Sequence, residues 1–183
     1  MQNYDAASDK KRKREIIDSR ICLMAGAGDE HIDVQDNLNT IFNIYFNQSG
    51  RKCRARNDSD LIIDKNNIFK PDLKVLCRDN GDIPVIVIEV SSKSTRDRDL
   101  GVKMKKYAEF GIKEYWIITW EARAADIYLL SEDRIYRHYK SYALFADDDK
   151  IEIDEETDII NEFSPVSFPE LKIKLADVFN IWI

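Results

Sequence analysis

The sequence predicts a mixed α/β domain, and three observations support that fold class. Residues 30–46 carry apolar side chains at helical spacing, the pattern of an amphipathic helix. Residues 84–90 (PVIVIEV) are the most apolar run of the chain, and their β-branched side chains are typical of a strand buried on both faces. Residues 98–110 return to helical spacing before another apolar run at 115–120 (YWIITW). A helix between two buried strands indicates a crossover, and therefore a sheet covered by helices.

The elements expected near the amino terminus are short. Residues 1–14 end in five consecutive bases, which indicate the solvated first turns of a helix, a frayed and mobile tail, or a basic arm that touches phosphate. Residues 20–25 (RICLMA) are compatible with a strand. Asp29 is a candidate cap for the helix that follows, and His31 falls near the buried stripe at the start of that helix.

Short strands dominate the region after Arg51. Three β-compatible runs are separated by polar turns, at residues 52–56, 61–64 and 73–77. Asn80-Gly81 is a favoured turn pair, and it precedes the apolar strand 84–90.

The last third of the chain continues with strands. Gly111 is the expected stop of helix 98–110. A hairpin is expected from residues 125–130 and 134–139, because a short polar turn separates two β-compatible runs. An acidic loop at residues 147–158 follows, and a short helix is expected to end the chain.

The composition is that of one globular domain spanning residues 1–183. Hydrophobic residues make up 44% of the chain and charged residues 34%, which argues against disorder. The formal net charge of −6 argues against a protein that coats DNA through bulk positive charge. The charge is uneven, however, since residues 147–158 carry −7 and the remainder of the chain carries +1. An enzyme that acts on nucleic acid stays compatible with this distribution, because it needs only a local basic surface.

Cysteine usage and hydropathy bear on the compartment. The cysteines Cys22, Cys53 and Cys77 have no CxxC spacing, and such a scattered set predicts reduced thiols in a reducing cytoplasm. No stretch approaches the roughly 20 apolar residues that span a bilayer, and residues 1–14 lack the apolar core of a signal peptide. We therefore expect a cytoplasmic protein with no membrane contact.

Two carboxylates occupy positions where an acid is unusual. Asp72 follows Pro71 and begins a strand, and Glu89 lies near the end of the most apolar strand. An ionised carboxylate in such a strand is costly unless it pairs with a cation or a metal ion. If the two strands are neighbours, both acids meet at one edge of the sheet, where the backbone carbonyl of Val90 can join them. Hard ions such as Mg²⁺ or Mn²⁺ prefer an all-oxygen site of this kind.

Lys103 is the third candidate residue of the site. At 100° per residue it falls in the apolar stripe of helix 98–110, beside Leu100 and Tyr107, whereas Lys105 falls on the opposite side. An inward lysine requires an anionic partner, and the nearest strand offers Glu89. A lysine at a metal site can stabilise negative charge that develops on phosphate.

Each of these residues also has a structural interpretation. Asp72 alone is commonly a turn or cap residue, and Lys103 alone can extend to solvent or form a buried ion pair with Glu89. Three cations near the start of the helix can contact phosphate or remain in solvent: Lys93, Arg96 and Arg98. The convergence of the two acids and Lys103 on one geometry favours metal-dependent phosphodiester chemistry.

The residues above belong to longer stretches: Pro71-Asp72, residues 88–95 (IEVSSKST), the four-residue steps from Asp99 through Lys103 to Tyr107, and residues 111–117 (GIKEYWI). Together these stretches resemble the Uma family of putative restriction endonucleases, in the PD-(D/E)XK nuclease superfamily. The resemblance implies a restriction-endonuclease-like fold, a central mixed β-sheet flanked by helices that holds the two acids on adjacent strands.

The resemblance also implies an activity, the hydrolysis of DNA phosphodiester bonds with Mg²⁺ or Mn²⁺. Asp72 and Glu89 would bind the metal ion with the carbonyl of Val90, and Lys103 would take the role of the catalytic lysine. His31 and Glu15 are auxiliary candidates near the site. The partner would be DNA, and a homodimer is expected because two sites most easily cut two strands.

The chain departs from the superfamily at one position. The signature places a lysine two residues after the strand-borne acid, where this chain has Ser91, so Lys103 must substitute from the helix. We therefore expect a metal-dependent DNA endonuclease. Two alternatives stay open: a weak or inactive nuclease-fold domain that binds nucleic acid or associates with itself, and a purely structural α/β protein.

Overall fold

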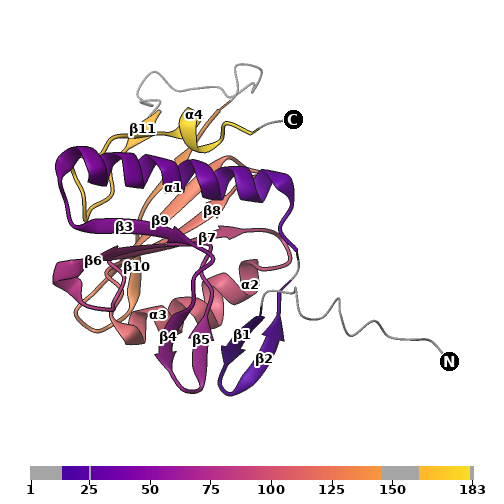
Figure 1. The fold of residues 1–183 in the computed structure, drawn as a ribbon. Helices are drawn as coiled ribbons and strands as arrows, with labels where there is room; N and C mark the ends of the chain where they lie inside the picture. The colour runs from indigo at the N-terminus through magenta and orange to yellow at the C-terminus, as the bar shows by residue number, and fades with distance from the viewer. Residues whose placement is uncertain (1–13, 25, 146–160, 182–183) are drawn as a thin grey trace.

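A computed structural model describes residues 14–24, 26–145 and 161–181 (Figure 1). The strands are β1 (Arg14–Ile17), β2 (Arg20–Leu23), β3 (Cys53–Asn57), β4 (Leu61–Asp64), β5 (Asn67–Phe69), β6 (Leu73–Cys77), β7 (Ile86–Ser91), β8 (Glu114–Thr119), β9 (Ala124–Leu130), β10 (Tyr136–Ala143), β11 (Glu162–Phe163) and β12 (Ile173–Lys174). The helices are α1 (Asp29–Ser49), the 3₁₀ turn η2 (Arg78–Asn80), α2 (Arg96–Arg98), the π-helical turn η3 (Asp99–Lys103), α3 (Met104–Phe110) and α4 (Leu175–Val178). The expected acidic loop at 147–158 lies outside the described residues, as does the basic stretch 1–14 except for Arg14.

Six strands form the central sheet in the order β10-β9-β8-β7-β6-β3. Neighbouring strands are antiparallel except β7 and β8, which run parallel. The chain reaches β8 from β7 through α2, η3 and α3, since parallel neighbours need a crossover connection. The mixed α/β class, the crossover helix and the 125–139 hairpin are therefore as the sequence predicts.

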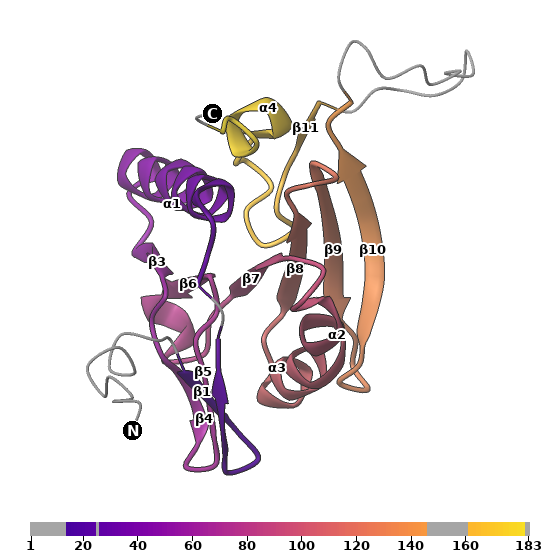
Figure 2. The same ribbon diagram turned by 90° about the vertical axis from the view of Figure 1, so that its right-hand side faces the viewer.

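Strand β7 is the centre of the fold, and all six of its residues are buried. Alternate side chains serve two different cores, as expected of a strand covered on both faces. Ile86, Ile88 and Val90 pack into the core that contains α1 and the carboxy-terminal segment. Val87 packs into a second core with Tyr107 of α3. Figure 2 shows α1 and α3 on opposite sides of β7. Glu89 lies on the α3 side by the same alternation.

Helix α1 covers the first of these cores. Its apolar stripe is buried as the sequence predicts, at Val34, Leu38 and Phe42 among others. The start of the helix differs from the expectation. Asp29 is already the first helical residue, and the cap position belongs to Gly28, which has extended backbone and no capping side chain. Asp29 therefore contributes as an acid in the first turn, where the helix dipole stabilises a negative charge.

A second, four-stranded sheet has the order β2-β1-β5-β4, and its two hairpins project from the body (Figures 1 and 2). Its inner face packs Ile17, Leu61 and Phe69 against Tyr107 of α3. Strands β1 and β5 were not predicted from the sequence. Arg14 begins a strand rather than lying in a helical turn or a tail, because residues 14–17 pair with β2 and β5.

The state of the cysteines differs from the prediction. Cys53 of β3 and Cys77 of β6 form a disulfide bond, whereas Cys22 is free. The sequence predicted reduced thiols at all three positions. Register explains the difference, since Cys53 lies directly opposite Cys77 in the antiparallel pair. The sequence does not reveal this proximity, because the two cysteines are 24 positions apart. Within the described residues, no helix is both long and apolar enough to cross a membrane.

Candidate active site

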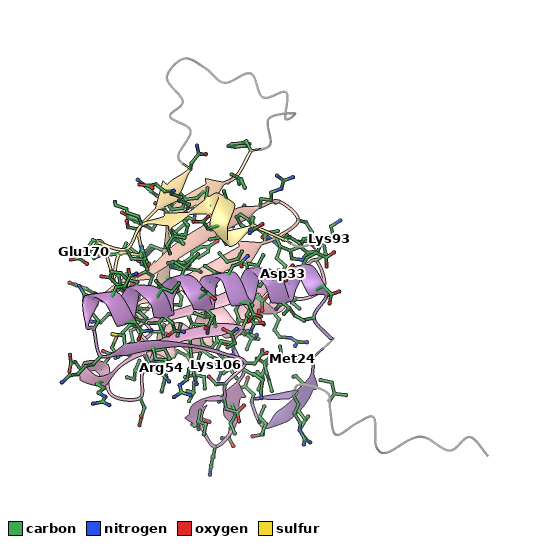
Figure 3. All side chains as sticks on the ribbon, turned by 45° about the horizontal axis from the view of Figure 1, so that its top comes forward. Met24, Asp33, Arg54, Lys93, Lys106 and Glu170 are labelled. Carbon is green, nitrogen blue, oxygen red and sulfur yellow. A yellow bond between two sulfur atoms is a disulfide. The ribbon has the colours of Figure 1, made fainter. Side chains whose placement is uncertain are left out.

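A cavity of about 370 Å³ opens at the amino-terminal end of α1. Its walls come from the segment between β2 and α1, the loop after β7, the start of the crossover helix and the end of β8. Met24 lines the cavity, and Figure 3 shows Met24 and Lys93 on either side of this end of α1. Asp72, Glu89, Val90 and Lys103 all line the same cavity. The structure thus brings the principal candidates of the sequence together in one place.

Asp72 is fixed by three elements. Leu73 pairs with Ile88 between β6 and β7, so Asp72 lies beside the end of β7. The amide N–H of Val90 donates a hydrogen bond to Asp72 Oδ2 at 2.8 Å. The side chain of Gln35, on α1, donates to the carbonyl oxygen of Asp72. The carboxylate is buried and cannot move far from the backbone that follows Glu89.

Glu89 is held by two donors from the crossover helix. Tyr107 Oη donates to Glu89 Oε1 at 2.8 Å, and Lys103 Nζ donates to Glu89 Oε2 at 2.9 Å. Burial raises the pKa of Glu89 well above its usual value, against the opposing influence of Lys103, and the Asp72 carboxylate raises it further. Burial and the Glu89 carboxylate likewise raise the pKa of Tyr107. The phenol therefore stays a proton donor to Glu89.

Lys103 lies at the centre of a ring of acids, with only 2% of its side chain exposed. Its Nζ is 2.9 Å from Glu89 Oε2, 3.1 Å from Glu15 Oε1 and 3.6 Å from Asp99 Oδ1. Burial by itself would lower the pKa of Lys103, but these carboxylates outweigh burial and raise it. Lys103 is therefore a permanent cation and not a general base.

The local helix geometry places two of these groups together. Asp99 and Lys103 begin and end the π-helical turn η3, and both side chains are buried. A single π-helical turn inside a helix is frequent at functional sites. Lys105 has 76% of its side chain exposed, so the inward and outward lysines are those the spacing predicts.

The auxiliary candidates also reach the site. Glu15 comes from β1 and is fully buried, and it accepts a hydrogen bond from the amide of Lys70 at 3.0 Å. His31, in the first turn of α1, places Nε2 3.0 Å from Asp72 Oδ1. This contact is within ion-pair distance, although no hydrogen bond of good geometry joins the two atoms.

Gln35 was not identified from the sequence, and Asp99 and Tyr107 were named only as part of the family resemblance, without a role at the site. Asp99 could have been found, because it lies four residues before Lys103 on the same helical face. Tyr107 lies in the predicted apolar stripe and in the motif of the resemblance, and its hydroxyl, once buried, needs a hydrogen-bond partner. Nothing in the local sequence marks Gln35, since only the packing of α1 on β6 brings it to Asp72.

The donor set suits a divalent cation completed by substrate and water. Among the described residues, no group of three His, Cys, Asp or Glu side chains is arranged to hold a metal ion. Mg²⁺, however, is usually bound through one or two carboxylates, with water and substrate phosphate completing its shell. Asp72, Glu89 and the Val90 carbonyl could supply oxygen ligands of this kind.

The excess of buried acids at the site, and the buried atoms that lack hydrogen bonds, also favour a bound cation. Four buried carboxylates of the site, Glu15, Asp72, Glu89 and Asp99, outnumber the one buried ammonium. Buried polar atoms without a hydrogen-bond partner include Glu15 Oε2 and His31 Nε2 at the site, and Ser91 Oγ two residues after Glu89. His31 Nε2 and Glu15 Oε2 have charged neighbours but no hydrogen bond. A cation with its water would supply both charge and hydrogen bonds to such buried atoms.

Comparisons with known proteins agree with this architecture. The model of the Uma2 family, described as "Putative restriction endonuclease", matches residues 1–159. An uncharacterized protein of Synechocystis sp. is 30% identical over 135 residues, which are 68% of this chain and 70% of that protein. A crystal structure from Anabaena variabilis, described as a putative nuclease belonging to DUF820, has 15% identity and a TM-score of 0.68, covering 91% of this chain and 89% of that chain. The central mixed sheet flanked by helices is therefore a fold that this nuclease-fold neighbour shares.

Proposed function

Because the chain belongs to the Uma2 family of putative restriction endonucleases, we propose that it is a metal-dependent endonuclease that hydrolyses phosphodiester bonds of DNA. The observation that carries the proposal is the convergence of Asp72, Glu89 and Lys103 at one cavity. A structural ion pair between Glu89 and Lys103 would not require a second carboxylate beside it, because each added buried acid costs free energy. The placement of Asp72 against the end of β7 therefore supports a cation site.

Asp72 and Glu89 would hold Mg²⁺ or Mn²⁺, with the carbonyl of Val90 as the third ligand. A bound divalent ion supplies a Lewis acid and a more acidic water molecule. The protein contributes rigidity, since the Val90 amide fixes one carboxylate and Tyr107 and Lys103 fix the other. Fixed ligands of this kind need little reorganisation during the reaction.

Lys103 and His31 have separate tasks in this proposal. The Lys103 ammonium offsets the charge of the surrounding acids and holds Glu89 Oε2 in place. His31 faces the other carboxylate and lines the cavity, so it can help to hold Asp72 in place. Glu15 completes the ring around Lys103.

Cleavage of supercoiled plasmid tests the proposal. The wild-type protein is expected to nick or linearise the plasmid with Mg²⁺ or Mn²⁺ and not with EDTA. Asp72→Asn and Glu89→Gln are expected to abolish cleavage. Calorimetric titration of Mn²⁺ should show binding to the wild type that Asp72→Asn removes. Asp82→Asn is the matched control, because Asp82 is exposed in the turn between β6 and β7.

Wild-type protein that binds neither metal ion, or Asp72→Asn that cuts as well as wild type, would contradict this function. Binding of DNA without cleavage under all metal conditions would instead favour a nuclease-fold binding module. We also propose a homodimer, since two sites can cut the two strands of a duplex. Light scattering coupled to gel filtration measures this directly, and a mass near 21.4 kDa would contradict it.

A further inference from the structure

The cavity contains more acids than bases, although its proposed substrate is anionic. Glu30, Asp72, Glu89, Asp99 and Glu121 contribute carboxylates to its lining. The lysine and arginine side chains that line it within the described residues are Arg98 and Lys103. Substrate phosphate therefore has two side-chain cations to meet besides His31 and a metal ion.

Lys103 is already paired with buried carboxylates of the site. Its Nζ lies within ion-pair distance of Glu15, Glu89 and Asp99, and almost none of its surface is exposed. A direct contact with phosphate would require one of these ion pairs to break inside a buried site, where an unpaired carboxylate is costly. The lysine therefore acts on the carboxylates and not on the substrate.

Arg98 has the opposite character. It immediately precedes Asp99 at the start of the crossover helix, and 35% of its side chain is exposed. Its Nη1 lies 3.9 Å from Glu15 Oε2, a distance that allows charge attraction but is too long for a hydrogen bond. Glu15 Oε2 is itself buried without a hydrogen-bond partner. Charge attraction thus places the Arg98 guanidinium near the site, while its N–H groups donate no hydrogen bond to Glu15.

The neighbouring cations do not share this position. Arg96 donates from Nη1 to Thr119 Oγ1 at 3.1 Å, and Arg96 is not part of the cavity lining. Lys93 is exposed and lies outside the lining as well. The sequence offered Lys93, Arg96 and Arg98 as equal candidates for a phosphate contact, and the structure separates them.

We propose that Arg98 binds a phosphate of the DNA strand in the cavity and that Glu15 positions its guanidinium for that contact. A guanidinium presents a planar fork of donors that matches two phosphate oxygens. Glu15 is the positioning residue, held in turn by Lys103 and the Lys70 amide. This inference rests on the proposed function only in taking DNA as the anion.

The test is binding of a fluorescein-labelled DNA duplex measured by anisotropy with Ca²⁺, with cleavage of the same duplex followed under Mg²⁺. Arg98→Gln is expected to raise Kd about tenfold. It should also make the salt dependence of log Kd shallower by about one unit of slope. Arg98→Lys should recover part of the affinity. Arg96→Gln is the matched control and should bind and cut as the wild type does.

Glu15 is tested in two backgrounds. Glu15→Gln is expected to change Kd in the wild type and to have no effect in Arg98→Gln, because it acts through Arg98. An equal effect in both backgrounds would overturn the positioning role. Thermal unfolding of every variant verifies the fold.

Two results separate this inference from the proposed function. Normal Kd and salt slope in a folded Arg98→Gln protein would overturn the phosphate contact, even if the wild type cuts DNA with Mg²⁺. Weakened binding by Arg98→Gln in a protein that never cuts would support the contact and count against the nuclease.

Discussion

Lys103 Nζ lies 2.9 Å from Glu89 Oε2, joining the crossover helix to the central strand β7. The distance is that of a charge-assisted hydrogen bond. Position 91, where the superfamily signature has its lysine, is occupied by a serine whose hydroxyl is buried without a partner. In this chain the buried cation that contacts Glu89 therefore comes from the crossover helix.

Replacing Lys103 should destabilise the protein strongly. Lys103→Met leaves Glu15, Glu89 and Asp99 buried without their common cation, and breaking a buried pair in this way costs about 3–5 kcal/mol. Lys105→Met removes an exposed lysine and should change stability by about 0.5 kcal/mol or less. Urea unfolding of both variants measures the difference, and equal stabilities would contradict the burial of Lys103.

The Tyr107 hydroxyl should be worth about 1–3 kcal/mol of stability. Tyr107→Phe removes the donor to Glu89 Oε1 and leaves a buried carboxylate oxygen unsatisfied. In a Glu89→Gln background the same substitution should cost less, because the acceptor is no longer a carboxylate. Tyr139→Phe is the control, since Tyr139 is 47% exposed. Identical costs of Tyr107→Phe in both backgrounds would show that the hydroxyl does not act on Glu89.

Stability should fall as the pH rises from 4.5, the ordinary pKa of a glutamate, toward the raised pKa of Glu89 in the folded protein. Burial raises the pKa of Glu89 in the folded protein, whereas the unfolded chain releases this proton near its ordinary value of 4.5. Between the two values the folded state binds more protons, so the free energy of unfolding decreases with pH by at most about 1.4 kcal/mol per unit. The raised pKa of Lys103 adds no slope there, because Lys103 is protonated in both states.

Glu89→Gln should flatten this dependence. Urea unfolding of wild type and variant from about pH 5 to about pH 8, without metal ions, gives the comparison. Glu109→Gln changes an exposed glutamate and should follow the wild type. Parallel curves for wild type and Glu89→Gln would mean that Glu89 ionises alike in the folded and unfolded states.

Reduction should weaken the pairing of β3 with β6. The Cys53–Cys77 disulfide joins residues 24 positions apart, and chain entropy gives about 3 kcal/mol of stabilisation for a loop of that size. Cys53→Ser/Cys77→Ser should unfold at lower denaturant concentration than the oxidised wild type, and reducing agent should affect only the wild type. Alkylation with mass spectrometry should find Cys22 modified and the other two protected. Modification of all three without reductant would restore the original expectation of free thiols.

The core elements of the site were predictable because they follow local rules. The β-branched run around Glu89 is typical of a buried strand, and the spacing of residues 98–110 turns Lys103 inward whatever the helix packs against. The limits of that reasoning are visible in β1 and β5. Residues 14–17 and 67–69 become strands through pairing with each other and with neighbours, and strand propensity depends strongly on such context.

The sequence by itself determined which faces are buried, the crossover between β7 and β8, and the presence of two acids and an inward lysine. Only the tertiary structure decided which distant groups meet. Glu15 reaches Lys103 because a separate hairpin sheet packs on α3, and Cys53 meets Cys77 because β3 and β6 are in register. The physical reason is that periodicity records how each segment partitions between water and core, whereas contacts between segments depend on strand order and register, which no local pattern encodes.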